Sequence, residues 1–248
     1  MKIAERIAWV GNKFLSILAA LLILLLFSYG AYSLWDIYRI NNNAFVSDEL
    51  LRYKPNGTDN LGFDELRKLN QDVKAWITIN DTHIDYPIVQ GKDDMEYINK
   101  DVFGEFALSG SIFLSSHNKG DFSDFYNMTY GHHMENGAMY GDLSKMMDKK
   151  FLKEHQKGTL YLPDKTYEID LYATLECHAY ESRVYGIASI QNHMDSFQSF
   201  VKENAKSYLD IDIQPSDKVI ALSTCMSATT NGRIVVFGVL KETEKEAS

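Results

Sequence analysis

Residues 218–240, KVIALSTCMSATTNGRIVVFGVL, contain two apolar runs joined by a short loop of small and polar residues. Such runs, rich in β-branched residues, predict two strands at Lys218–Thr224 and Arg233–Leu240. Cys225 stands where the first strand ends, and Arg233 opens the second, so the two side chains could lie side by side across a hairpin. Strand ends commonly present catalytic groups, and a nearby guanidinium favours the reactive thiolate. The hairpin therefore predicts a β-rich fold with a candidate nucleophile at Cys225.

The chain on the N-terminal side of this hairpin continues the strand-and-turn pattern. Six further runs bounded by Gly, Pro, Asn or Asp predict strands at Trp76–Ile79, His83–Val89, Ser111–Ser115, Met128–Tyr130, Thr159–Leu162 and Tyr167–Ala179. Helical spacing is confined to Asp64–Asn70, Leu143–His155 and Met194–Tyr208. Eight short strands with few helices predict a mainly β fold, a closed or nearly closed barrel.

One segment near the N-terminus is long and apolar enough to cross a membrane. Phe14–Trp35 contains 22 residues without a charge, and about 20 such residues span a bilayer core. Lys2, Arg6 and Lys13 precede it, so the positive-inside rule keeps the N-terminus in the cytoplasm. A cleavable signal peptide is the alternative, but its apolar core is usually only about 7–15 residues long. We expect a single-pass cell-membrane protein with an extracellular catalytic domain.

These features divide the chain into five expected parts. They are a cytoplasmic N-terminus (1–13), a transmembrane anchor (14–35), a stalk with the loop that leads into the domain (36–62), the catalytic domain (63–242) and a C-terminal tail (243–248). The formal net charge of the chain is −9; residues 1–35 contribute +2, which leaves about −11 on the portion beyond the anchor. Such acidity argues against nucleic acid as a partner, because the phosphate backbone is bound by positive charge.

A cysteine nucleophile needs a group that accepts and returns a proton, and imidazole does both. Among seven histidines, His132 follows a predicted short strand in the motif YGHHM. Zinc is the alternative for His132 and His133, but neighbouring residues on a strand point to opposite faces and no metal-ligand spacing occurs. We expect no metal and no cofactor. Cys177 lies in an alternating run and is expected to face inward as a small apolar residue; a buried structural role is also the alternative for Cys225.

The motifs resemble those of a known enzyme family. Leu222–Cys225 with Arg233, the YGHHM motif at Tyr130–Met134 and the N-terminal anchor together resemble the class B sortases. Further segments match in the same order: Ala75–Ile77, Ile84–Gln90, Gly110–Phe113 and the helix Met194–Tyr208. The resemblance implies an eight-stranded sortase-type barrel with short N-terminal helices and a helix between strands 6 and 7.

The resemblance also implies a reaction, that of the cysteine transpeptidases of Gram-positive bacteria, which cleave a C-terminal sorting signal after its threonine. Carried onto this sequence, Cys225 would attack the threonine carbonyl, His132 would act as acid and base, and Arg233 would hydrogen-bond the substrate or the oxyanion. The matching substrate-binding positions are Ile98, Tyr185, Ile187 and Ser223.

The implied partners are surface or pilin proteins that carry a sorting signal. The amine that receives the acyl group would come from a peptidoglycan precursor or from a pilin lysine, and the sequence does not choose between them. Two other functions stay open at this stage. One is a membrane-anchored, non-enzymatic binding domain, and the other is a cysteine hydrolase without a dedicated amine acceptor.

Overall fold

The computed structural model describes residues 2–55, 61–214, 216–226 and 231–243. Contacts within the chain divide it into two units, Met1–Asn42 and Asn43–Ser248. The second unit therefore begins inside the stretch 36–62 that the sequence assigns to the stalk, and Ala44 in this stretch is buried.

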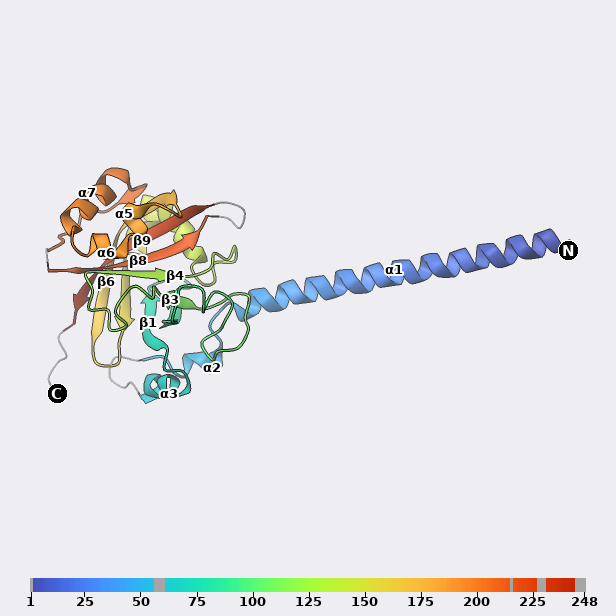
Figure 1. Cartoon of the computed structure of the whole chain (residues 1–248), viewed down its shortest axis with the longest axis horizontal. Coiled ribbons are helices and arrows are strands. Elements are labelled where there is room, and N and C mark those ends of the chain that lie inside the picture. The colour runs from blue at the N-terminus through green and yellow to red at the C-terminus, as the bar shows by residue number, and fades with distance from the viewer. Residues whose placement is uncertain (1, 56–60, 215, 227–230, 244–248) are drawn as a thin grey trace. The chain divides into compact units, whose positions relative to one another are not determined.

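The first unit consists of the long helix α1, Ile3–Asn43, apart from its last residue (Figure 1). Its segment Ile3–Asn41 is long and apolar enough to cross a membrane, with a mean hydropathy of 2.4 in its most apolar window and no burial within the protein. The helix extends beyond the predicted span Phe14–Trp35 at both ends because no proline interrupts it. It is a candidate membrane span, as the sequence predicts.

The second unit is built around a closed barrel of eight strands. These strands are β1 (Val73–Ile79), β2 (Asp85–Val89), β3 (Ile112–Leu114), β4 (Tyr126–Tyr130), β5 (Lys157–Tyr161), β6 (Thr166–His178), β8 (Lys218–Cys225) and β9 (Gly232–Glu242). They follow the order β5-β1-β2-β3-β4-β8-β9-β6, and the β5–β6 pairing closes the ring. A two-residue strand, β7 (Ser207–Tyr208), adds to the outer edge of β6. All eight predicted strands are present, which confirms the predicted barrel.

The helices lie before the barrel and in two of its connections. They are α2 (Asp48–Leu51), α3 (Leu61–Leu69), η1 (Gly141–Met147), α4 (Lys149–Glu154), α5 (Ser182–Tyr185), α6 (Ile187–Ile190) and α7 (Met194–Asn204). The short N-terminal helices and the helix between the sixth and seventh barrel strands are confirmed as α2, α3 and α7. Helix α7 ends four residues earlier than the predicted Tyr208 because Ser207 and Tyr208 pair with β6. The predicted helix 143–155 is divided because Asp148 caps a separate helix α4 with its side chain.

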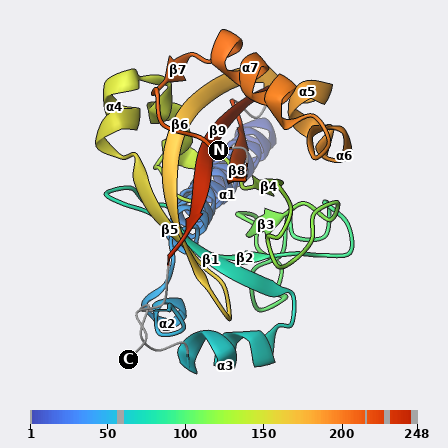
Figure 2. The same cartoon turned by 90° about the vertical axis from the view of Figure 1, so that its left-hand side faces the viewer.

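Two faces of the barrel wall are covered by separate apolar clusters. Along β8, Ile220 and Leu222 belong to the cluster inside the barrel, whereas Val219 and Ala221 pack with α5, α6 and α7 outside it. Figures 1 and 2 both show these three helices gathered beside β6, β8 and β9. The alternation of strand side chains thus directs the odd-numbered positions of β8, including Cys225, towards the outer, helix-covered face.

Candidate active site

Cys225 and Arg233 lie directly opposite one another at the open end of the β8–β9 pair. Side chains opposite one another in an antiparallel pair point to the same face, with Cβ atoms about 4.5–5.5 Å apart. Both residues are half-buried. The hairpin therefore sets the two residues side by side on one face, as the sequence predicts for this pair.

His132 is brought to Cys225 by a parallel pairing of distant strands. Strands β4 and β8 run parallel, with Tyr130 opposite Ser223. Two hydrogen bonds continue this pairing by one step: the Gly131 amide donates to the Ser223 carbonyl (3.1 Å), and the Thr224 hydroxyl donates to the Gly131 carbonyl (2.8 Å). His132 follows Gly131 directly, two residues beyond the end of β4, so this register carries it to the same end of the β4–β8 pair as Cys225.

One hydrogen bond fixes the tautomer of the His132 ring. Its Nε2 lies 2.8 Å from the backbone carbonyl oxygen of Ile98. A carbonyl oxygen only accepts hydrogen bonds, so Nε2 carries the hydrogen and the neutral ring keeps Nδ1 as its basic atom. The His132 carbonyl in turn accepts a hydrogen bond from the Tyr140 amide (3.0 Å). The ring and its backbone are thus held from two sides.

Cys177 lies on the same face, although the sequence analysis expects it to face the core. A bulge in β6 between Leu171 and Ala173 shifts the alternation by one residue, so that Cys177 lies opposite Arg233. Burial raises the pKa of the Cys177 thiol to about 11, although its hydrogen bond with Tyr185 and the charge of Arg233 lower this pKa slightly. Both cysteines are free, and the two-strand separation of about 9–10 Å exceeds the reach of a disulfide.

The four predicted substrate-binding residues all lie near this face. The Tyr185 hydroxyl in α5 lies 3.0 Å from the hydroxyl of Ser223, which is two positions before Cys225 on β8. Burial raises the pKa of Tyr185, so its hydroxyl stays protonated. Ile98 meets the site through its carbonyl. Ile187 is buried in the outer apolar cluster, against which Tyr185 also packs.

Two residues of the site were not singled out by the sequence analysis. Gly131 and Thr224 carry the hydrogen bonds that hold β4 to the end of β8. The glycine beside the histidine was a usable signal, because a glycine at a strand end often marks a close backbone approach. A Cβ atom at Gly131 would stand 2.4 Å from the Ile112 side chain.

The row His132, Cys225, Arg233 can therefore be compared with known enzymes. A family model described as the sortase domain matches residues 77–241, well over half of the chain. The chain belongs to the sortase family. This match runs from within β1 to near the end of β9, so it includes nearly the whole barrel and leaves out the N-terminal segments, the first residues of β1 and the last residues of the chain.

Its relatives place this sortase in class B. The Sortase B of Listeria monocytogenes is 33% identical over 210 residues, which cover 83% of this chain and 79% of the relative. A class B sortase of Streptococcus pyogenes involved in pilus biogenesis is 37% identical with a TM-score of 0.68, covering 73% of this chain and 98% of that structure. The sortase B from the type II pilus of Streptococcus pneumoniae is 36% identical with a TM-score of 0.63, covering 73% and 99%. This sortase is thus a class B enzyme of the cysteine transpeptidase type, which sets aside a non-enzymatic binding domain.

Proposed function

We propose that this sortase cleaves a C-terminal sorting signal after threonine and transfers the resulting acyl group from Cys225 to an amine. The observation that carries this proposal is the row of three side chains on adjacent strand ends. His132 follows the end of β4, on one side of β8, and Arg233 lies on β9, on the other side, opposite Cys225. A thiol between a base and a guanidinium has what acyl transfer requires.

In the first half-reaction, His132 Nδ1 takes the thiol proton and the Cys225 sulfur attacks the threonine carbonyl carbon. The carbonyl oxygen becomes an oxyanion. Arg233 donates from Nη1 to the Gly232 carbonyl at 3.0 Å. A guanidinium carries five N–H groups, and in this proposal others of them bind the oxyanion or the substrate. When the C–N bond breaks, His132 gives its proton to the leaving amine, and a thioester remains on Cys225.

In the second half-reaction, the incoming amine attacks the thioester carbonyl and loses a proton to His132. The new amide forms as the C–S bond breaks, and the Cys225 sulfur leaves as a thiolate that regains its proton from His132. Atoms and charges balance without any cofactor or metal.

The acceptor we favour is a lysine amine on a pilin subunit. The two streptococcal structures at 37% and 36% identity are described as pilus sortases. A peptidoglycan precursor remains the competing acceptor. Surface or pilin proteins that bear a sorting signal are the proposed donors, and Ile98, Tyr185, Ile187 and Ser223 are the proposed lining of their binding groove.

The proposed location is the cell membrane, with α1 as a single-pass anchor. Support comes from the apolar span and from Lys2, Arg6 and Lys13 ahead of its uncharged part, which favour a cytoplasmic N-terminus and an extracellular barrel. The division of the chain at residues 13, 35, 62 and 242 stays a prediction.

A pair of cysteine variants tests the chemistry. The full chain is incubated with a panel of sorting-signal peptides together with either oligoglycine or a pilin lysine peptide, and the products are weighed by mass spectrometry. Cys225→Ala should abolish cleavage, whereas Cys177→Ala should retain it because its thiol is two strands away. Full cleavage by Cys225→Ala would refute the proposal. Hydrolysis alone with every amine would favour the cysteine hydrolase instead.

A further inference from the structure

The loop that carries His132 is a short hairpin. This His132 loop, residues 131–140, leaves β4 and turns back towards η1. The Tyr140 amide donates to the His132 carbonyl at 3.0 Å, and His133 forms an antiparallel bridge with Met139. Because the two arms are hydrogen-bonded together, a displacement of the return arm displaces the backbone of His132.

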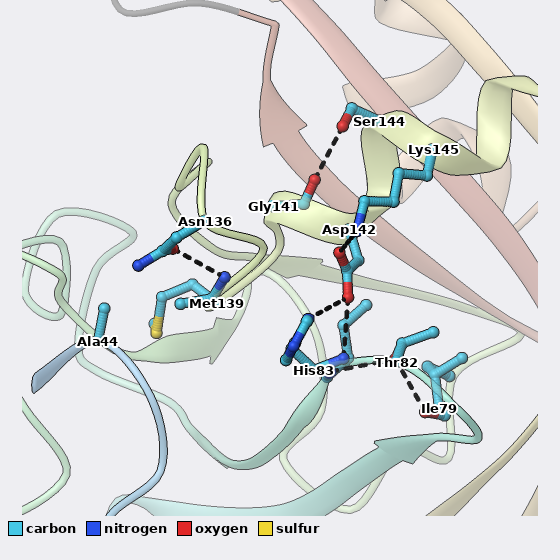
Figure 3. A network of polar contacts seen from close by, with 12 residues as sticks. Ala44, Ile79, Thr82, His83, Asn136, Met139, Gly141, Asp142, Ser144 and Lys145 are labelled. Carbon is cyan, nitrogen blue, oxygen red and sulfur yellow. Dashed lines mark hydrogen bonds and ion pairs between the residues drawn. The ribbon is translucent and has the colours of Figure 1, made fainter. Parts of the chain in front are cut away.

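A buried carboxylate stands behind the tip of this loop. Asp142, at the start of η1, is 1% exposed. Its Oδ2 accepts hydrogen bonds from the His83 amide (2.9 Å) and from His83 Nδ1 (2.8 Å). Its Oδ1 forms an ion pair with Lys145 Nζ at 2.8 Å. Figure 3 shows the carboxylate between η1 and the turn that holds His83.

The tip of the His132 loop lies directly against the hydrogen-bonded pair of Asp142 and His83. Gly137 adopts a φ of +89°, and a Cβ atom on it would stand 2.7 Å from Asp142 Oδ1 and 2.8 Å from His83 Nδ1. No side chain fits between the loop tip and the pair. The position of the tip therefore depends on where Asp142 and His83 are held.

The return arm has a second tie to the same hairpin of the barrel. The Met139 amide donates to the Tyr86 hydroxyl at 2.8 Å, and that hydroxyl donates to the Ala44 carbonyl at 3.0 Å. Tyr86 belongs to β2, and His83 lies in the turn that precedes β2. One hairpin thus holds the His132 loop at its tip and at its return arm.

We propose that Asp142, through His83, is a positioning residue for His132, with Tyr86 as a second and independent tie. Asp142 touches neither the substrate nor the reacting atoms in this assignment, and the inference rests on the proposed role of His132. A misplacement of about 1 Å in a catalytic group can cost roughly a hundredfold in rate, so contacts that hold the His132 loop in place affect kcat.

The test compares Asp142→Asn with a matched variant in the full chain. Asp170→Asn is the control, because Asp170 is also a buried carboxylate paired with two lysines, Lys157 and Lys241. It lies on β6, far along the strand from the site. Both variants should lose thermal stability. Asp142→Asn alone should lower the kcat of peptide cleavage at least tenfold, with KM within twofold of the wild-type value.

Hydrogen exchange supplies a readout that does not depend on activity. The Met139 and Tyr140 amides should exchange faster in Asp142→Asn than in Asp170→Asn. Equal exchange and equal kcat in the two variants would overturn the inference. If Cys225→Ala abolishes cleavage while Asp142→Asn keeps the wild-type kcat, the inference alone fails. If the wild-type chain cleaves no peptide, the proposed function fails and the exchange comparison still decides the role of Asp142.

A second variant covers the case in which Asp142→Asn does not fold. Tyr86→Phe keeps the buried ring and removes both hydrogen bonds of its hydroxyl. It should raise the exchange rate of the Met139 amide and lower kcat while KM stays the same. Wild-type exchange and kcat in Tyr86→Phe would contradict the second tie.

Discussion

Replacing Gly131 by alanine should disturb His132 through lack of space rather than through backbone conformation. Gly131 is not among the glycines with positive φ. Its added Cβ would stand 2.4 Å from Ile112 Cδ1 and 2.8 Å from Tyr140 Cδ2, whereas ordinary contact begins at 3.4 Å. Ile112 is buried, but its Cδ1 is the far end of a flexible side chain and can shift. The Tyr140 ring cannot, since it is fully buried and its hydroxyl lies 2.9 Å from that of Thr129.

The backbone at Gly131 must therefore retreat by about 0.6 Å from the Tyr140 ring. This retreat stretches the two hydrogen bonds that Gly131 makes to β8. Overpacking of this kind costs about 1–3 kcal/mol of unfolding free energy. Because a shift of about 1 Å can cost a hundredfold in rate, we expect kcat to fall by roughly tenfold or more.

The measurement combines chemical denaturation with the kinetics of peptide cleavage. Gly104→Ala is the matched control, because Gly104 has a φ of +89° but nothing within 4 Å of an added Cβ. It should lose about 1 kcal/mol through backbone strain and keep its kcat. The reasoning is refuted if Gly131→Ala keeps the wild-type kcat and loses no more stability than Gly104→Ala.

Two further predictions concern the outer face of the site. Tyr185→Phe leaves the buried Ser223 hydroxyl without its Tyr185 partner, so the unfolding free energy should fall by about 1–3 kcal/mol in chemical denaturation. The double variant that adds Ser223→Ala should recover part of this loss. No recovery would argue against the hydrogen bond between the two hydroxyls. Because burial raises the pKa of Cys177 to about 11, only about 0.1% of it is thiolate at pH 8, against about a quarter for an ordinary thiol. Native Cys225→Ala should therefore take up almost no iodoacetamide at pH 8, and mass spectrometry that finds rapid labelling would contradict the buried setting of Cys177.

Much of the fold was readable from local pattern. All eight barrel strands were predicted, because each is a short apolar run bounded by turn residues, and such runs need no distant information. Helix boundaries were less accurate where a tertiary contact competed with helical spacing. Ser207 and Tyr208 left the helix to pair with β6, and Asp148 started a new helix within an expected one.

The amino-acid sequence by itself determined that Arg233 and Cys225 lie side by side, because one hairpin joins them and its register follows from local pairing. The placement of His132 was decided only by the fold, since it depends on a parallel pairing between strands more than 80 residues apart in the chain. The tertiary structure also decided which face of the barrel wall carries the Cys177 side chain, because one bulge in β6 reverses the alternation of the strand. Strand periodicity is a local property, whereas strand partners and bulges arise from packing of the whole barrel.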